Sequence, residues 1–166
     1  MATVIDTGIA GVNLRELHLF RDSRGWLAEV YRQDESEHQP VMAYISVTQP
    51  NVARGPHEHD YQADLFVFAG PGNFTIYLYD NRPQSPTYKA SYSETFGEKR
   101  PAWMTVPAGV IHAYRCISSS PGLILNLPDK LYKGPGKKEE IDEIRHENDP
   151  NSPFYSVFDR ALFMNE

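Results

Sequence analysis

The sequence is poor in cysteine, in basic charge and in long apolar runs. Its single cysteine, Cys116, excludes an internal disulfide and favours a cytoplasmic location. Sixteen basic residues against 22 acidic ones give a net charge of −6, which argues against nucleic acid, because such a partner needs a basic face. No apolar run approaches the roughly 20 residues of a membrane span, and the N-terminus lacks the basic start and apolar block of a signal peptide. We expect a cytoplasmic protein without a membrane or nucleic-acid partner.

Turn-forming and aromatic residues are abundant instead. The 166 residues include 13 Pro, 11 Gly, ten Tyr and eight Phe, a composition that favours strands and turns over helices. The length suits one domain with a real core, and no stretch resembles a linker. We therefore predict a single domain over residues 1–166.

Short apolar or alternating segments follow one another at intervals of about ten residues. They predict strands at residues 26–32, 41–49, 64–70, 74–80, 102–109, 110–118 and 122–128. Strands this closely spaced, without long helices between them, predict an all-β fold, an antiparallel sandwich or barrel.

The last third of the chain differs from the rest. KKEEIDEIRHEN (137–148) predicts a short C-terminal helix with Ile141 and Ile144 on one side, and Asp149-Pro150 should end it. The apolar segment 152–163 is expected either to pack back on the barrel or to lie at a subunit interface.

Two histidines lie close together in the segment RGPHEHDYQADLF (54–66). His57 and His59 have strand spacing, so both side chains should point to one face, and Asp64 follows five residues later. Far along the chain, PAGVIH (107–112) ends in His112. His18, His38 and His146 lie outside any motif, and we expect them at the surface.

The patterns HxHx4D…G and PxGxxH resemble the two motifs of the cupin superfamily. That resemblance implies a cupin-like jelly-roll barrel and a metal site made of His57, His59, Asp64 and His112, a ligand set suited to one divalent transition metal. The chain departs from the pattern in three ways: the acid is Asp rather than Glu, the spacing to Gly70 is one residue short, and Cys116 stands where an Asn is usual.

A second resemblance covers residues 20–150. FRDSRGWLAEVYR (20–32), VARGPH (52–57), YDNRPQSPTY (79–88), VPAGVIHAY (106–114) and NDP (148–150) resemble, in the same order, motifs of the dTDP-4-dehydrorhamnose 3,5-epimerase family. The resemblance implies a jelly-roll fold and a homodimer. It also implies an enzyme of carbohydrate biosynthesis, which inverts carbons next to the ketone of a dTDP-4-keto-6-deoxy sugar and needs no cofactor. Such a reaction needs a base, an acid for the opposite face and a group that holds the enolate oxygen.

The family's functional residues carry over by motif position. His57 matches the catalytic base, Asp149 the aspartate that pairs with it, and Tyr132 the acid. In the substrate-binding set, Arg54 matches the diphosphate ligand and His112 a second pocket histidine. Arg24 and Glu29 match residues that reach the nucleotide, often across the dimer.

One departure leaves the mechanism open. Near the place of a family lysine that helps to stabilise the enolate stands Asp64, and a carboxylate would oppose an oxyanion. Two alternatives to the epimerase hypothesis follow. One is a metal-dependent cupin enzyme using the four ligands named above, and the other is a non-catalytic protein that binds sugar nucleotides.

Overall fold

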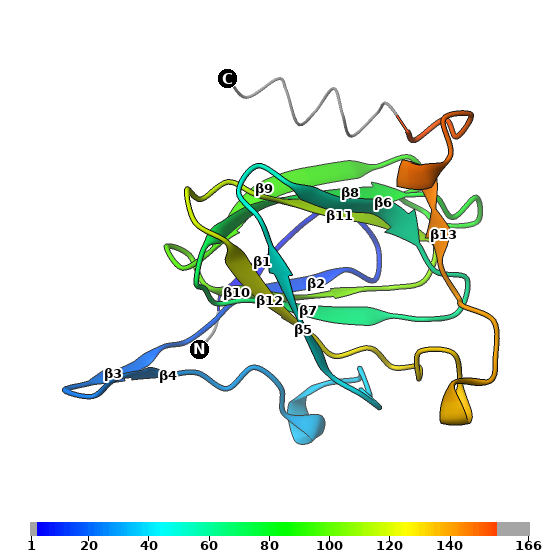
Figure 1. The fold of residues 1–166 in the computed structure, drawn as a ribbon. Helices are drawn as coiled ribbons and strands as arrows, with labels where there is room; N and C mark the ends of the chain where they lie inside the picture. Colours follow the sequence, from blue (N-terminus) through cyan, green and yellow to red (C-terminus); the bar gives the residue numbers. More distant parts are fainter. Residues whose placement is uncertain (1–2, 156–166) are drawn as a thin grey trace.

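The computed structural model describes residues 3–155, which form two antiparallel β-sheets packed face to face (Figure 1). The six-stranded sheet has the order β1 (Val4–Ile5), β2 (Asn13–Glu16), β10 (Ala102–Val106), β7 (Asp64–Phe68), β12 (Gly122–Asn126) and β5 (Tyr44–Thr48). The five-stranded sheet has the order β13 (Ile144–Arg145), β6 (Ala53–Glu58), β11 (Val110–Cys116), β8 (Asn73–Asp80) and β9 (Ser91–Gly97). The predicted all-β antiparallel fold is confirmed.

A separate hairpin joins β3 (Phe20–Asp22) to β4 (Gly25–Leu27) and projects from the body of the molecule, at the lower left of Figure 1. The strand predicted over 26–32 is therefore limited to its first residues. The chain continues without strand pairing and contains a short 3-10 turn, η1 (Gln33–Glu35).

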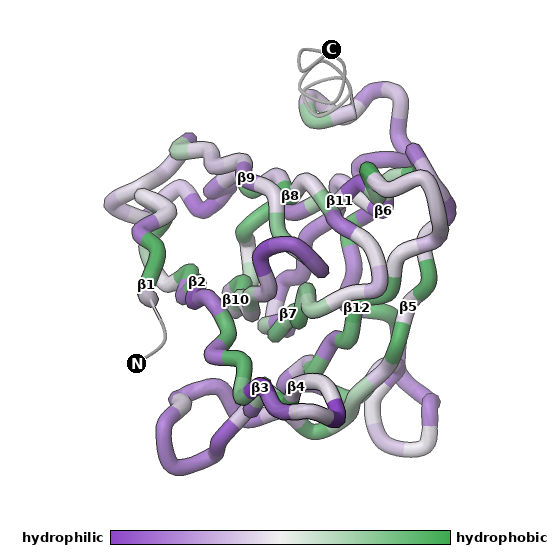
Figure 2. Tube along the Cα trace, turned by 90° about the vertical axis from the view of Figure 1, so that its left-hand side faces the viewer, coloured by the Kyte–Doolittle hydropathy of each residue, from purple (hydrophilic) through white to green (hydrophobic). Residues whose placement is uncertain are grey.

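The core lies between the two sheets because every second side chain of each strand points inward. Phe66 and Phe68 of β7 face Phe74 and Ile76 of β8, all at most 3% exposed. In Figure 2 the hydrophobic stretches coincide with barrel strands such as β5 and β7, whereas many surrounding loops are hydrophilic. Alternation in strands such as β8 and β10 supplies the sandwich interior, whereas Ile45 and Val47 of β5 are exposed.

Strand β11 is buried on both faces. Tyr114 points into the core, while Ile111 and Ala113 form a second apolar cluster on the outer side of the sheet. Phe154 packs against this outer cluster, and its ring lies 5.2 Å from that of Tyr79. The part of segment 152–163 that the structure describes therefore packs on the barrel, and residues 156–163 lie outside the described residues.

The helix predicted over residues 137–148 is wrong. This segment and its surroundings form the 3-10 turns η2 (Pro135–Lys137) and η3 (His146–Asn148), with the two-residue strand β13 between them. Residues 3–155 contain no α-helix. In this part of the chain, no helix has the length and apolar character needed to cross a membrane.

Candidate functional site

A cavity of about 1060 Å³ opens between the end of the barrel and the segment that follows β12. Strands β5, β6 and β11 form one wall, with Tyr44, His57 and Tyr114 lining it, and residues 128–147 form the other. In Figure 1 this second segment, in yellow and orange, runs along one end of the two sheets before β13 joins the five-stranded sheet. The cavity is thus bounded by chain segments distant in sequence.

Two histidines, His57 and His59, line this cavity, and His112 is buried next to them. His57 of β6 lies directly opposite His112 of β11 in the strand register, and their ring centroids are 4.4 Å apart. His59 follows β6, with its ring 6.0 Å from that of His57 and 5.8 Å from that of His112. One nitrogen from each ring lies within 4.8 Å of the others. The structure brings together the histidines that the two motifs singled out.

Gly55 explains why a glycine stands two residues before His57. Its φ of +85° is in the left-handed region, which strains side chains other than glycine. An added Cβ would collide with the carbonyl oxygen of His112. The pairing of β6 with β11 is irregular between His112 and Tyr114, and a side chain at residue 55 would separate the strands there. The glycine lets β6 approach closely enough to pair the two histidines.

Asp64 is buried beside two of these histidines. Its Oδ2 lies 3.2 Å from Nε2 of His59 and 3.6 Å from Nε2 of His112. Its Oδ1 accepts hydrogen bonds from the side-chain amides of Asn126, at 2.8 Å, and Gln62, at 3.0 Å. These hydrogen bonds hold the carboxylate in place and compensate for the water that it loses on burial.

Burial and charge shift the pKa values of this group in opposite directions. Burial opposes the charge of His59, but its bond to Asp64 and the carboxylate charge raise the pKa of His59 to about 9. Burial likewise opposes the charge of Asp64, yet His59 and the neighbouring charges lower the pKa of Asp64. Burial, together with His57, lowers the pKa of His112 to about 3. At neutral pH the site holds a His59–Asp64 ion pair beside a neutral His112.

The tautomer of His112 follows from its hydrogen bond. The Nδ1–H of His112 donates to the carbonyl oxygen of Val110 at 3.0 Å, so the lone pair lies on Nε2. This Nε2 is buried and has no hydrogen-bond partner among the described residues. A nitrogen lone pair facing the carboxylate of Asp64 at 3.6 Å needs a proton or a cation between them. The three histidines therefore converge as ligands of one divalent transition metal would, and the carboxylate of Asp64 lies beside two of them.

Two glutamates face His57. Its Nδ1 lies 3.6 Å from Oε1 of Glu147 and 3.8 Å from Oε1 of Glu143. Although burial opposes it, the interaction with His57 lowers the pKa of Glu147. Asp149, the partner expected from the NDP motif, is exposed, and its carboxylate accepts the backbone N–H of Asn151 at 2.9 Å. The structure does not bring Asp149 to His57.

The segment that carries the glutamates is tied to the turn after β6. The carboxylate of Asp142 accepts the backbone N–H groups of Asp60, Tyr61 and Gln62 at 2.8 to 3.0 Å. The Nδ1–H of His59 donates to the carbonyl oxygen of Asp142. These bonds place residues 142–147 against the histidines.

His146 fixes the same segment from its other side. Its Nε2 bonds Glu58 at 2.9 Å and its Nδ1 bonds Ser152 at 2.7 Å. This histidine is buried, not at the surface as expected. A signal was present in the sequence: Glu143, Arg145 and Glu147 alternate with Ile144 and His146, which is the period of a strand.

Arg54 and Tyr132 are two further residues that the sequence motifs singled out. Both line the large cavity. Arg54 donates to Thr48 Oγ1 at 3.0 Å and to the carbonyl oxygen of Val47 at 2.9 Å, which holds its guanidinium at the wall. Tyr132 is 46% exposed, on the segment that faces the barrel.

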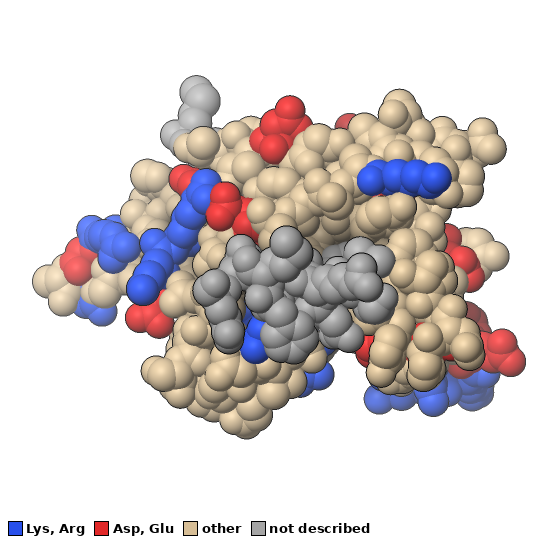
Figure 3. Space-filling view, turned by 90° about the horizontal axis from the view of Figure 1, so that it is seen from above, with Lys and Arg blue, Asp and Glu red and all other residues tan. Residues whose placement is uncertain are grey.

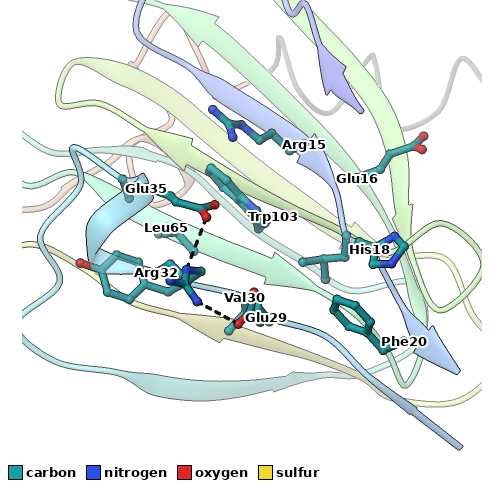
Figure 4. Close-up of a pocket in the computed structure, with 13 residues that line it drawn as sticks. Arg15, Glu16, His18, Phe20, Glu29, Val30, Arg32, Glu35, Leu65 and Trp103 are labelled. Carbon is teal, nitrogen blue, oxygen red and sulfur yellow. Dashed lines mark hydrogen bonds and ion pairs between the residues drawn. The ribbon is translucent and has the colours of Figure 1, made fainter. Parts of the chain in front are cut away.

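Arg24 and Glu29 lie away from the large cavity of their own chain. Arg24 stands on the projecting hairpin, highly exposed, and pairs with Asp22 at 2.5 Å. Glu29 lines a second cavity of about 310 Å³ next to Trp103 and pairs with Arg32 at 3.3 Å (Figure 4). Neither residue lines the cavity that contains His57 of the same chain.

Charge on the outer surface is mixed. Figure 3 shows basic and acidic side chains interspersed over the visible described residues, without a broad basic patch. The net charge of −6 agrees with this distribution.

Comparison with known proteins agrees with the motifs. Residues 6–143 match the sequence profile of the dTDP-4-dehydrorhamnose 3,5-epimerase family. The chain is 36% identical over 135 residues to the probable low-salt glycan biosynthesis epimerase Agl13 of Haloferax volcanii, covering 80% of this chain and 86% of the relative. It is 33% identical over 126 residues to the spore coat polysaccharide biosynthesis protein SpsL of Bacillus subtilis, covering 75% and 82%.

Solved structures share the fold. A dTDP sugar isomerase from Desulfovibrio desulfuricans G20 superposes with a TM-score of 0.74 at 23% identity, covering 85% of this chain and 87% of that one. The dTDP-4-dehydrorhamnose 3,5-epimerase of Bacillus anthracis, solved with TDP and PPi bound, gives 0.71 at 24% identity, covering 80% and 79%. The expected cupin-like jelly roll is confirmed.

Proposed function

The chain belongs to the dTDP-4-dehydrorhamnose 3,5-epimerase family, and on this premise we propose that it inverts a carbon next to the ketone of a dTDP-linked 4-keto-6-deoxy sugar. Family membership makes the chain an isomerase that acts on nucleotide sugars. The observation that carries the finer proposal is His57, which lines the large cavity with a carboxylate on its Nδ1 side. The substrate sugar binds there, next to the histidine.

The proposed chemistry is proton removal and return. A C–H bond beside a ketone is acidic because the carbanion delocalises into the carbonyl, and His57 is the base that accepts the proton. Tyr132, on the opposite wall of the cavity, is the proposed acid that returns a proton to the other face of the sugar. No organic cofactor takes part in this scheme.

The carboxylate of Asp64 does not stand alone in this site. His59 pairs with it at 3.2 Å and carries a positive charge at neutral pH, because its pKa is raised to about 9. The pair is neutral overall, so the developing enolate does not meet an uncompensated negative charge. The pairing supports epimerase chemistry in a chain without the family lysine.

Arg54 is the proposed ligand of the diphosphate, because a guanidinium presents several donors to phosphate oxygens. Lys130 and Lys133 also line the cavity and add positive charge near its rim. His112 is the proposed second histidine of the sugar pocket.

We further propose a cytoplasmic homodimer. Arg24 and Glu29 are far from the cavity of their own chain, on or beside the projecting hairpin. Exposed apolar side chains on that hairpin, Phe20, Trp26 and Leu27, offer a contact surface for a second copy. In such a dimer, the two charged residues reach the nucleotide in the partner's cavity.

Solvent exchange tests the epimerase proposal. Incubation with a dTDP-4-keto-6-deoxyhexose in deuterated water should replace hydrogen at C3 or C5 with deuterium, as followed by NMR. The His57→Ala variant should lose this exchange by about 100-fold or more, because the general base is absent. Binding of the nucleotide sugar without exchange in the parent protein would contradict catalysis and favour the non-catalytic alternative.

A metal-dependent enzyme is the second candidate. The unpartnered Nε2 of His112, which faces Asp64, and the convergence of three histidines favour it. His57, His59, Asp64 and His112 would hold the ion, which would supply a Lewis acid to polarise a substrate oxygen. His57 could then not serve as the base, because a metal-bound nitrogen has no lone pair for a proton.

Elemental analysis separates the two candidates. Protein purified without a His tag should contain about one divalent ion per chain if the second candidate is right, and His112→Asn should lower this content. The exposed His18 provides the matched control, since His18→Asn should leave the metal content unchanged. A content far below one per chain, unchanged by added Ni, Zn, Fe or Mn, would exclude the metal enzyme.

A further inference from the structure

His57 has one ring nitrogen without a partner. Its Nδ1 is buried and makes no hydrogen bond among the described residues. Buried polar atoms in native proteins are almost always paired, so an unpaired one points to an interaction that forms during function. Two carboxylate oxygens of the described residues lie close to this nitrogen, Oε1 of Glu147 at 3.6 Å and Oε1 of Glu143 at 3.8 Å.

The two glutamates differ in their other partners. Oε2 of Glu143 accepts two hydrogen bonds from Arg145, at 2.7 and 2.9 Å, so its charge is already compensated. Oε2 of Glu147 is buried and has no hydrogen-bond partner among the described residues. Asp149 is exposed and bonded to the backbone of Asn151. Of these three carboxylates, Glu147 is therefore the one with a buried oxygen that lacks a hydrogen-bond donor among the described residues.

We propose that Glu147 is the positioning residue that orients His57, in the role that the NDP motif would give to Asp149. The inference rests on the proposed function in one respect, that His57 acts at the reacting centre. The Nδ1–H of His57 donates to the Glu147 carboxylate, which leaves the lone pair on Nε2. The same arrangement orients a histidine that ligates a metal, so the inference holds for both candidate functions.

The fold holds Glu147 at this place from two sides. Strand β13 pairs with β6 so that Arg145 lies opposite His57, and Glu147 comes two residues later. The residue between them, His146, is anchored to Glu58 and Ser152 on the other side of the segment. The backbone is therefore fixed, and only the side chain has to move.

The remaining gap is short. At 3.6 Å the Nδ1 and Oε1 atoms are too far apart for a hydrogen bond, whose length is about 2.9 Å. Catalytic hydrogen bonds of ligand-free enzymes are often long and tighten when the substrate binds. With side chains only 15% and 27% exposed, His57 and Glu147 meet where water competes weakly for the bond.

The test reads the His57 ring directly. Nitrogen-15 NMR of the six histidines, with His57→Asn to identify the signals, reports which ring nitrogen carries the proton at a pH where the ring is neutral. In the nucleotide-bound parent, His57 should carry it on Nδ1. Glu147→Gln should shift His57 toward a mixture of tautomers, whereas the matched variants Glu143→Gln and Asp149→Asn should leave its signals unchanged.

Kinetics provide a second readout. Glu147→Gln should lower kcat for exchange at the sugar carbon by between about 10- and 1000-fold with KM nearly unchanged, because the ring is misoriented while the substrate contacts remain. Glu147→Asp should recover part of this loss, since it restores the charge with a shorter reach.

The outcomes separate the two proposals. Unchanged His57 signals in Glu147→Gln, or altered ones in Asp149→Asn, would overturn the role of Glu147. If the signals respond to Glu147→Gln but the parent protein shows no exchange, the positioning role stands and the epimerase proposal fails. The five other histidines report the fold of each variant, and Glu147→Asp serves if Glu147→Gln does not fold.

Discussion

His59 and Asp64 form a buried ion pair on which both the charge of the site and the stability of the fold depend. The side chains are 10% and 2% exposed, and Nε2 of His59 lies 3.2 Å from Oδ2 of Asp64. The two side chains form an ion pair only while the histidine is protonated. We therefore expect the stability of the protein to depend on pH.

The stability of the protein should fall as pH rises through about 9. The pKa of His59 in the folded protein is raised to about 9, above its value in the unfolded chain. The stabilisation that His59 provides is therefore fully present below the unfolded pKa and is lost as pH rises through the folded pKa. That contribution is on the order of 3 kcal/mol, the free energy of the pKa difference. Urea unfolding between pH 6 and 9.5, with a chelator present, measures it. His59→Gln should lack the decline, and equal slopes in both proteins would contradict it.

Asp80 is a second residue whose role is visible only in its contacts. It lies in the stretch YDNRPQSPTY, one of the motifs that resemble the family, and it is fully buried. Its carboxylate accepts hydrogen bonds from Arg82 at 2.7 and 2.9 Å, Ser85 at 2.6 Å and Thr87 at 2.7 Å. Residues 80–90 are therefore organised around one charge, and this motif builds a loop rather than the large cavity.

Replacement of Asp80 by Asn should destabilise the protein by about 3 kcal/mol, because it leaves the Arg82 charge unpaired. Burial opposes the charge, but the bonds from Arg82, Ser85 and Thr87 hold the pKa of Asp80 well below its usual range. A group with a lowered folded-state pKa stabilises the protein above its unfolded pKa, and this stabilisation is lost as pH falls. The difference in free energy of unfolding between parent and variant should therefore shrink toward pH 2.5. Urea unfolding at pH 7 and 2.5 checks this. The exposed Asp34→Asn should change stability by less than about 0.5 kcal/mol.

The sequence predicted one half of the candidate site and not the other. His57, His59, Asp64 and His112 were predicted as one group because the two motifs that contain them resemble a known ligand pattern. Glu143 and Glu147 were not, since their position depends on how a charged segment far from the motifs pairs with β6. Periodicity within one strand carries no information about which distant segment will join it.

At the level of elements, segment 137–148 shows why the helix prediction failed. Its charges suit a solvated helix, but several of them have partners across the site: Asp142 bonds the turn at 60–62 and His146 bonds Glu58. Those tertiary bonds are available only to an extended backbone that pairs with β6. Helix propensity is worth less than about 1 kcal/mol per residue, so a few buried polar bonds decide the conformation.

Asp142 should control the order of the turn after β6. Asp142→Ala removes the acceptor of three backbone N–H groups, each a bond to a charged group. Hydrogen exchange at the amides of residues 60–62 should accelerate by about 10-fold or more, because 1.4 kcal/mol corresponds to that factor. Mass spectrometry or NMR can measure it. Asp129→Ala, which removes a single bond to Ala63, should leave these three amides protected.

At the level of the whole molecule, the hairpin β3–β4 does not contribute to the large cavity of its own chain. It forms a separate two-stranded sheet that projects from the barrel. Trp26 and Leu27 are 48% and 63% exposed, and such apolar surface is typical of a contact site. A monomer leaves this hairpin and Arg24 without a role in the proposed reaction. A homodimer would use both, because the hairpin of one copy could reach the cavity of the other.

The proposed homodimer predicts that Trp26→Glu weakens association. Loss of an aromatic anchor from an interface costs about 2 kcal/mol or more, which raises the dimer dissociation constant by roughly 30-fold. Light scattering across a dilution series should show a dimer for the parent and a rising monomer fraction for the variant. Affinity for a dTDP-sugar should fall with it, because Arg24 no longer reaches a partner's cavity. Ile117→Ser, an equally exposed apolar residue away from the hairpin, should change neither measurement. A parent protein that remains monomeric at high concentration, yet binds the nucleotide sugar, would contradict the dimer and return Arg24 to the role of a surface residue.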